Sequence, residues 1–200
     1  MAKKTVKKED FDLGETMPSD GMNYAFEIKI PKERVAVLIG KSGETKKELE
    51  GFTDCKMDID SKEGDVRISG GDSIKMYALR EVVKAIGRGF NPEIARLLLK
   101  QDYALEIVNL LDYVKNKDHF ERLKGRVIGA EGKSRQTIEG LTGTFISVYG
   151  KTISIIGDSE GVVTSKKAIE SLLQGSPHSN VYRWLEKSRR ATKEKRAKDW

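Results

Sequence analysis

The sequence predicts an α+β fold made of two copies of one domain, and three observations lead to this prediction. A glycine motif occurs twice, with Gly40 and Gly129 standing 89 residues apart. The apolar positions around the motif recur in the same register. Within each copy, runs with the period of a helix alternate with short runs of period two, which indicates helices packed against a small sheet.

The repeat extends well beyond the glycines. The motif at 39–43 (IGKSG) returns at 128–132 (IGAEG), and the segment 50–53 (EGFT) returns at 139–142 (EGLT) without a gap. After a gap of two residues, the apolar alternation of the later strands matches as well. A chance match would not persist across helix, loop and strand positions, so we infer two domains of the same structure.

Each copy predicts one order of elements: strand, helix, glycine loop, helix, strand, strand, helix. In the first copy the alternation of apolar residues predicts strands at 24–30, 57–59 and 66–68. A long helix then begins at Asp72 or Ser73, because either side chain can cap the first turn. The predicted inner face of this helix consists of Ile74, Tyr77, Ala78, Val82, Ala85 and Ile86.

The composition excludes several classes of protein. One cysteine, Cys55, allows no internal disulfide and no cysteine-based zinc site, and it fits a reducing, cytoplasmic location. Two histidines argue against a histidine-rich metal site. The lysine-rich start has no apolar run behind it, so we expect no signal peptide, and no run is long enough to span a membrane. We expect no metal and no cofactor.

The net charge of +6 lies mostly at the C-terminal end, where residues 181–200 hold eight basic and three acidic residues. A basic tail is attracted to phosphates or to an acidic partner, although a solvated terminus that aids solubility is the open alternative. The predicted segments are a flexible N-terminus of mixed charge (1–21), the first domain (22–89), an interdomain helix (90–102), the second domain (103–180) and a basic C-terminal helix or tail (181–200).

The glycine loops suit the backbone of a nucleic acid. Two glycines three positions apart leave a turn without bulky side chains, so a sugar–phosphate chain can approach it. The unpaired N–H groups that begin the next helix attract phosphates. A lone GxxG also occurs in ordinary helix connections, but here its recurrence and the element order resemble the type I KH domain. We therefore predict two tandem type I KH domains, each a three-stranded antiparallel sheet packed on three helices.

The predicted RNA-binding residues are the loops and the basic residues beside them. They are Gly40, Lys41, Ser42, Gly43, Lys46 and Lys47 in the first copy, and Lys124, Arg126, Gly129, Ala130, Glu131, Gly132, Lys133 and Arg135 in the second. An apolar groove beside each loop accepts about four unpaired nucleotides. Its predicted walls are Leu38, Ile39, Met57, Ile59, Val127, Ile128, Ile146, Val148 and Tyr149. The same residues suit a domain core, and this alternative stays open.

Two residues admit opposite interpretations. Glu131 lies inside the second loop, where it either repels phosphates or places a favourable negative charge at the start of a helix. Tyr149 is either a platform for base stacking or a packed aromatic at the end of a strand.

The second copy is expected to dominate the affinity for RNA. Arg126 and Arg135 stand on both sides of its loop, and arginine can grip a phosphate with two hydrogen bonds. Its strand carries Ser147 and Tyr149 at positions where the first copy has two aspartates. The basic tail is expected to add affinity for all RNAs alike.

Three stretches carry a resemblance to a known family: 125–139 (GRVIGAEGKSRQTIE), 141–152 (LTGTFISVYGKT) and 87–93 (GRGFNPE). With these motifs the chain, over about 24–185, resembles the archaeal branch of the two-KH ribosome-assembly proteins, the partner-of-Nob-one and Krr-type KH family. The resemblance implies binding near the 3′ end of 16S-type small-subunit rRNA and cooperation with the endonuclease that matures this end. It implies, more weakly, an association with the alpha subunit of initiation factor two.

A non-enzymatic factor that binds single-stranded RNA in small-subunit biogenesis is thus the leading hypothesis. The alternatives are a general KH RNA-binding accessory of RNA processing or translation, and a protein-docking scaffold, which unlike an RNA binder would tolerate added salt. An enzyme is disfavoured because we find no P-loop and no catalytic histidine paired with a nucleophile. Asp58 and Asp60 share a strand face, which is more typical of a solvated edge than of a metal site.

Overall fold

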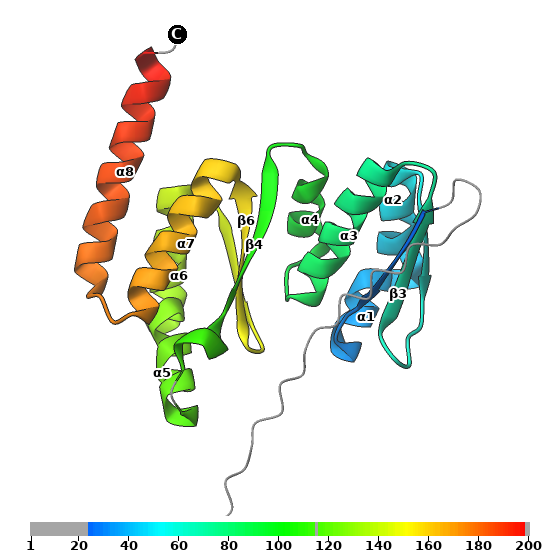
Figure 1. Cartoon of the computed structure of the whole chain (residues 1–200), viewed down its shortest axis with the longest axis horizontal. Helices are drawn as coiled ribbons and strands as arrows, with labels where there is room; N and C mark the ends of the chain where they lie inside the picture. Colours follow the sequence, from blue (N-terminus) through cyan, green and yellow to red (C-terminus); the bar gives the residue numbers. More distant parts are fainter. Residues whose placement is uncertain (1–23, 115, 199–200) are drawn as a thin grey trace, which may run out of the picture. The chain divides into compact units, whose positions relative to one another are not determined.

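The computed structural model describes residues 24–114 and 116–198. By its contacts the chain divides into two compact units, Met1–Arg80 and Glu81–Trp200, and the division falls inside one long helix. Each unit has a three-stranded antiparallel sheet with helices against it (Figure 1). The predicted fold class is therefore confirmed, whereas the predicted bounds of the domains stay predictions.

The first unit has the element order that the repeat predicted. Its sheet has the order β1-β3-β2, so the last strand lies in the centre. The elements are β1 (Tyr24–Lys29), α1 (Lys32–Ile39), a 3-10 turn (Lys41–Gly43), α2 (Glu44–Thr53), β2 (Lys56–Ile59), β3 (Asp65–Gly70) and α3 (Ser73–Gly87).

The outward face of the first sheet is polar, as the strand alternation requires. Val66 and Ile68 of β3 are buried, whereas Asp65 and Arg67, which alternate with them, are exposed. Arg67 pairs in register with Glu27 on β1 and Asp58 on β2, so charges of opposite sign alternate across this face. Cross-strand pairs of opposite charge stabilise a sheet modestly.

Helix α3 is capped as predicted but is turned differently from the prediction. The Asp72 carboxylate accepts hydrogen bonds from the N–H groups of Ile74 and Lys75. Ile74 and Tyr77 are exposed, at 78% and 55%, so their assignment to the inner face was wrong. The buried stripe is Met76, Leu79, Val82, Val83, Ala85 and Ile86. This stripe shares Val82, Ala85 and Ile86 with the predicted face but has Met76 and Leu79 in place of Ile74 and Tyr77.

The second unit repeats the order and adds helices at both ends. Its sheet order is β4-β6-β5. The elements are α4 (Pro92–Ala95), a 3-10 turn (Arg96–Leu99), β4 (Tyr103–Asn109), a 3-10 turn (Leu110–Tyr113), α5 (Lys117–Ile128), a 3-10 turn (Ala130–Gly132), α6 (Lys133–Thr142), β5 (Phe145–Tyr149), β6 (Thr152–Asp158), α7 (Ser159–Leu173) and α8 (His178–Lys198).

The central strand of the second unit's sheet, β6, is buried on both faces. Ile153 and Ile155 of β6 belong to the core that the helices cover, and Ser154 and Ile156, which alternate with them, are equally inaccessible to water. The 3-10 turn at Arg96–Leu99 contacts β4 and β6. This sheet therefore lacks the solvated outer face of its counterpart, because the segment before β4 folds over it.

Helix α8 is a structural part of the second unit rather than a loose tail. Val181 and Leu185 are buried in the core cluster of this unit. It packs along α6 and α7 as far as Thr192, and its last turns continue past them (Figure 1). The predicted C-terminal helix is thus docked by its apolar positions, as their spacing indicated.

Candidate nucleic-acid interface

The two glycine loops have the same backbone conformation. Gly40 and Gly129 have φ/ψ of 73°/177° and 74°/174°, and the third loop residue has a positive φ of 55° (Ser42) or 53° (Glu131). Each loop makes one 3-10 turn and then enters a helix. Two segments that share only two glycines and one isoleucine in five positions therefore form one shape, which indicates that the glycines dictate it.

The first glycine of each loop has no room for a side chain. A Cβ atom on Gly129 would stand 2.6 Å from Cβ of Ser134 and 2.7 Å from its backbone nitrogen. On Gly40 a Cβ atom would overlap Oγ1 of Thr45. A backbone with this φ and an extended ψ is moreover accessible almost only to glycine. The first glycine thus allows the loop to close tightly against the following helix.

The helix that follows each loop begins without a side-chain cap. Gly43 precedes α2 and Gly132 precedes α6, and neither helix start receives a side-chain hydrogen bond. The first N–H groups of a helix lack partners inside the helix and carry partial positive charge. These groups stand beside an open turn, which is the arrangement that binds phosphate.

The first loop has cations that are free to meet a phosphate. Lys41 and Lys47 are exposed and make no ion pair within the described part of the chain. Lys46 is only loosely paired, with its Nζ atom 4.0 Å from the carboxylate of Glu50. Lys41, Lys47, Ser42 and Glu44 line a shallow hollow at the loop. The predicted basic residues of the first copy therefore lie together.

Two of the predicted cations at the second loop form ion pairs with nearby glutamates. The Lys133 ammonium stands 3.3 Å from the Glu131 carboxylate, and the Arg135 guanidinium stands 3.7 Å from Glu139. Lys124 is half-buried. Glu131 is thus neither a simple repulsive charge nor a cap, because its exposed carboxylate pairs with the exposed lysine two positions later. A phosphate at this loop must compete with that pair.

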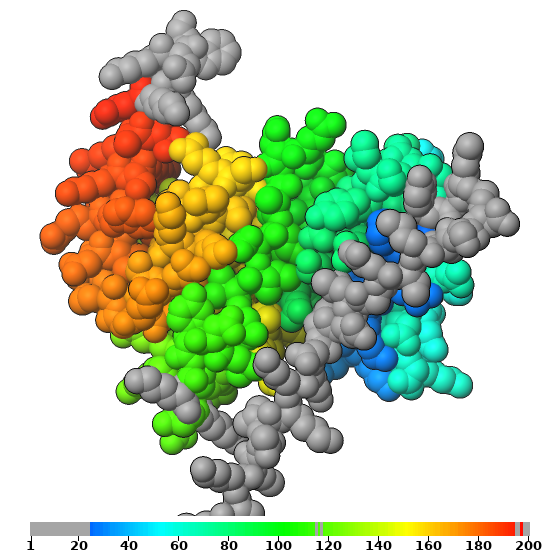
Figure 2. Space-filling model, in the orientation of Figure 1, coloured from blue at the N-terminus to red at the C-terminus, as the bar shows by residue number. Residues whose placement is uncertain are grey.

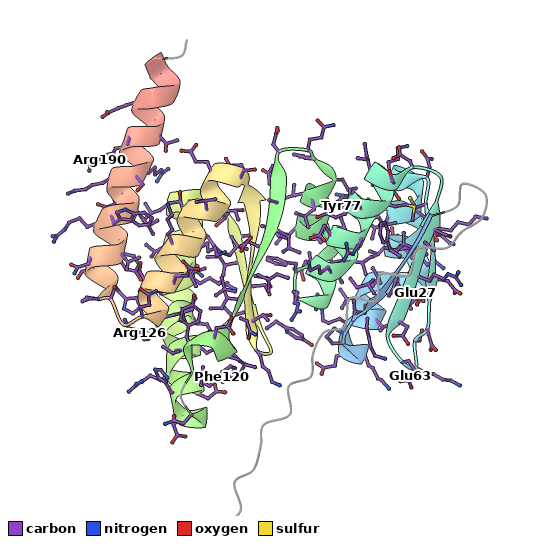
Figure 3. The ribbon with its side chains drawn as sticks, in the orientation of Figure 1. Glu27, Glu63, Tyr77, Phe120, Arg126 and Arg190 are labelled. Carbon is purple, nitrogen blue, oxygen red and sulfur yellow. The ribbon has the colours of Figure 1, made fainter. Side chains whose placement is uncertain are left out.

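Arg126 is committed to a structural role, in contrast with its predicted contact to RNA. Its Nε atom donates to the carbonyl of Leu172 at 3.0 Å, and Nη2 donates to the carbonyl of Ser176 at 2.7 Å. The His178 ring lies 2.8 Å from the backbone oxygen of Arg126. Figure 3 shows Arg126 at the junction of α5 with the turn between α7 and α8. The residue ties the C-terminal helix to the helix that precedes the second loop.

We expect Arg126→Ala to lower the free energy of unfolding by about 2 kcal/mol, because two carbonyl groups lose a charged donor. Arg135→Ala is the matched control, and it should cost less than about 1 kcal/mol because its ion pair is partly exposed. Urea unfolding followed by circular dichroism measures both. Equal costs for the two variants would contradict the structural role of Arg126.

The predicted groove walls fall into two groups. Leu38, Met57, Val127 and Ile146 are buried in the cores, so they support the groove from beneath and cannot line it. Ile39, Ile59, Ile128 and Val148 are half-buried, and their contact with bases stays a prediction. The repeat could not distinguish the groups, because both follow the apolar pattern.

Ser147 and Tyr149 face away from the groove. They alternate on β5 with Ile146 and Val148, which pack toward the helices. Ser147 donates to the backbone oxygen of Arg88 at 2.9 Å, and a Cβ atom on Gly89 would stand 2.9 Å from Cβ of Tyr149. The packed interpretation of Tyr149 therefore holds, and neither residue supports the expectation that the second copy dominates.

Two glutamates that the sequence analysis did not single out hold the strand beside each groove. Glu50 accepts a hydrogen bond from the N–H of Met57, and Glu139 accepts one from the N–H of Ile146, both at 2.7 Å. They lie 89 residues apart, so the repeat contained this signal. These contacts occupy an edge N–H group and fix the distance between helix and strand.

Asp58 and Asp60 have partners within the first unit. The Asp60 carboxylate accepts hydrogen bonds from the N–H groups of Lys62 and Glu63 in the turn before β3, and Asp58 lies across from Arg67. Among the described residues there is no group of three or more His, Cys, Asp or Glu side chains placed to hold a metal ion. In the same part of the chain, no helix combines the length and the apolar character that crossing a membrane requires.

Family models match both units. Residues 25–85 match a model described as KH domain, and residues 104–190 match a model described as eukaryotic type KH domain (KH domain type I), built on the second domain of PNO1. A KH domain-containing protein from Methanocaldococcus jannaschii is 47% identical over 185 residues, which are 90% of this chain and 81% of that protein. The RNA-binding protein PNO1 of Oryzias latipes is 36% identical over 51% of this chain and 43% of its own length.

Solved structures with the same fold include Dim2p from Pyrococcus horikoshii, at 47% identity, with 82% of this chain and 99% of that chain covered and a TM-score of 0.77. A chain from the a/eIF2alpha–aDim2p–rRNA complex of the same organism is 46% identical, with coverage of 84% and 96% and a TM-score of 0.80. A protein of unknown function from Aeropyrum pernix is 38% identical, with coverage of 90% and 98% and a TM-score of 0.84. Together with the two KH matches, these similarities show that this chain belongs to the two-KH-domain family that includes archaeal Dim2p and the pre-rRNA-processing protein PNO1.

Proposed function

We propose that this chain is a non-enzymatic RNA-binding protein of small-subunit biogenesis, which binds single-stranded rRNA near the 3′ end of the 16S-type molecule through its GxxG loops. The observation that carries the proposal is the pair of identical loops, each open to solvent and each followed by an uncapped helix start. A groove of this kind accepts unpaired bases and excludes an intact duplex.

The family supports this proposal. The aDim2p chain that is 46% identical to this one is named in a complex with a/eIF2alpha and rRNA. A fungal relative is named a pre-rRNA-processing protein PNO1. By analogy, the alpha subunit of initiation factor two is a proposed partner of this chain. The endonuclease that matures the 3′ end is a second proposed partner, which rests on the resemblance of the sequence motifs alone.

Binding of the purified full chain to labelled RNA tests the proposal. One RNA carries the single-stranded 3′ segment of 16S-type rRNA, a second is its scrambled version, and a third is the segment paired with its complement. We expect the 3′ segment to bind at least tenfold more tightly than either control, and to stay uncut in magnesium. Equal affinity for the scrambled RNA would favour a general KH accessory, and no binding to any of the three RNAs would contradict the proposal.

A protein-docking scaffold is the second candidate, favoured by large apolar side chains on the first unit. Phe52, Ile74 and Tyr77 are more than half exposed. Figure 3 shows Tyr77 on α3. Salt separates the candidates: for single strands, log K falls by about 0.7 per phosphate contact for each tenfold increase in salt, whereas apolar docking changes little.

A further inference from the structure

Helix α8 offers a rigid row of positive charge that the glycine loops do not explain. The helix is held on the second unit by the buried Val181 and Leu185 at its start. Farther along, the hydroxyl of Thr192 donates to the Glu160 carboxylate of α7 at 2.8 Å. These anchors recur at helical spacing, so the opposite side of the helix is fixed in its direction toward solvent.

Three exposed cations occupy that opposite side, together with the exposed carboxylates of Glu186 and Glu194. Arg183, Lys187 and Arg190 follow one another at spacings of four and three residues, and all three are exposed. None of them makes an ion pair within 24–114 and 116–198, the residues that the structure describes. Figure 3 shows Arg190 pointing away from the body of the unit, and Figure 2 shows the orange-to-red surface of α8 open to solvent.

Three of the predicted cations at the second glycine loop have partners within the protein. At that loop Lys133 is paired with Glu131, Arg135 with Glu139, and Arg126 is bonded to backbone carbonyls. On α8 the row of cations carries no such partners. Over 178–198 the helix holds eight basic and two acidic residues, so this unit attracts a polyanion along α8.

We propose that the outer face of α8 binds the phosphate backbone of a double-helical RNA segment adjoining the single strand held by the GxxG loops. The inference rests on the proposed function and adds a second kind of RNA contact to it. The exposed aromatic of this helix, Trp184, lies about 100° around the axis from Arg183, so it stands beside the row rather than within it.

A rigid RNA duplex matches the fixed spacing of the cations on α8. Arg183 and Arg190 are separated by about 10 Å along the helix axis, at about 1.5 Å per residue. A duplex presents dense phosphates along a fixed path, whereas a single strand must be ordered before it can follow a straight row of charges. Contacts to double-stranded RNA are mostly to its backbone and depend on shape, which requires no base-reading residues on α8.

The test compares two RNAs that share one single-stranded 3′ segment. The first RNA is the segment alone, and the second has a stable hairpin joined to its 5′ side. We expect wild-type protein to bind the hairpin-joined RNA about tenfold more tightly. The variant R183Q/K187Q/R190Q should lose this gain, with its salt slope on the joined RNA reduced by up to about three, while its affinity for the segment alone changes less than threefold.

A matched control removes the same charge elsewhere. K62Q/K151Q/K167Q alters three exposed lysines outside α8 and should keep the hairpin gain. Unchanged circular dichroism verifies that the α8 variant stays helical, as expected for glutamine at exposed helix positions.

If the hairpin adds no affinity to wild type, or if both triple variants lose the added affinity equally, the inference is wrong. Binding of wild type to the segment alone reports separately on the proposed function, and an α8 variant with unchanged RNA binding would point to an acidic protein as the occupant instead.

Discussion

Replacing Gly129 with alanine is expected to destabilise the second unit by about 3 kcal/mol or more. The new Cβ atom would meet Ser134 at 2.6 Å and its backbone nitrogen at 2.7 Å. Neither atom can withdraw easily, because Ser134 belongs to the first turn of α6. The φ/ψ of 74°/174° adds a conformational cost of about 1–3 kcal/mol for any residue with a side chain, and the overlap adds a similar amount.

The second glycine of the same loop provides the control. Gly132 also has a positive φ, of 77°, but its ψ of 8° lies in the left-handed helical region, and a Cβ atom there has only the side-chain nitrogen of Gln136 within 4.0 Å. Gly132→Ala should therefore cost only about 1 kcal/mol. Urea unfolding of the two variants measures the difference. Equal losses would show that the tight closure of the loop does not depend on the first glycine.

Aspartates in the centres of both loops are expected to lower the affinity for the single-stranded 3′ segment by at least 100-fold. The variant carries Lys41→Asp, Ser42→Asp, Ala130→Asp and Glu131→Asp. Aspartate tolerates the positive φ of the third loop position better than most residues, so the fold should persist. The added carboxylates stand where the uncapped helix starts would meet phosphates, and they repel them.

The two halves of this variant also rank the loops. The first pair removes Lys41 and adds two carboxylates, whereas the second adds only one charge to a loop whose Lys133 is already paired with Glu131. The expectation that the second copy dominates depended on Arg126, Ser147 and Tyr149, which the structure places elsewhere. We therefore expect the first-loop pair to cost at least as much affinity as the second. Fluorescence anisotropy measures each, and unchanged affinity with all four substitutions would contradict RNA binding through these loops.

The fold could be predicted because short-range sequence patterns determine its elements and because the two domain copies repeat these patterns. The glycine loop, the helix after it and the alternating strands each follow from short-range patterns, and the offset of 89 residues confirmed one pattern with the other. Even the hydrogen bonds of Glu50 to Met57 and of Glu139 to Ile146 follow this offset. The family motifs and the apolar spacing that docks α8 were equally accessible.

The use of each side chain could not be predicted in this way. Arg126 resembles a phosphate ligand in the sequence, yet its partners Leu172 and Ser176 lie about fifty residues away along the chain and meet it only in the folded unit. Tyr77 fits an apolar stripe on α3, but the neighbouring stripe with Met76 and Leu79 is the buried one. The sequence by itself thus determined the local elements, their repetition and the positions of the loops, because backbone preferences and periodicity act over a few residues. Only the tertiary structure decided which cations are neutralised, which apolar residues are covered and where free charge remains, because these depend on contacts between segments that are distant in the chain.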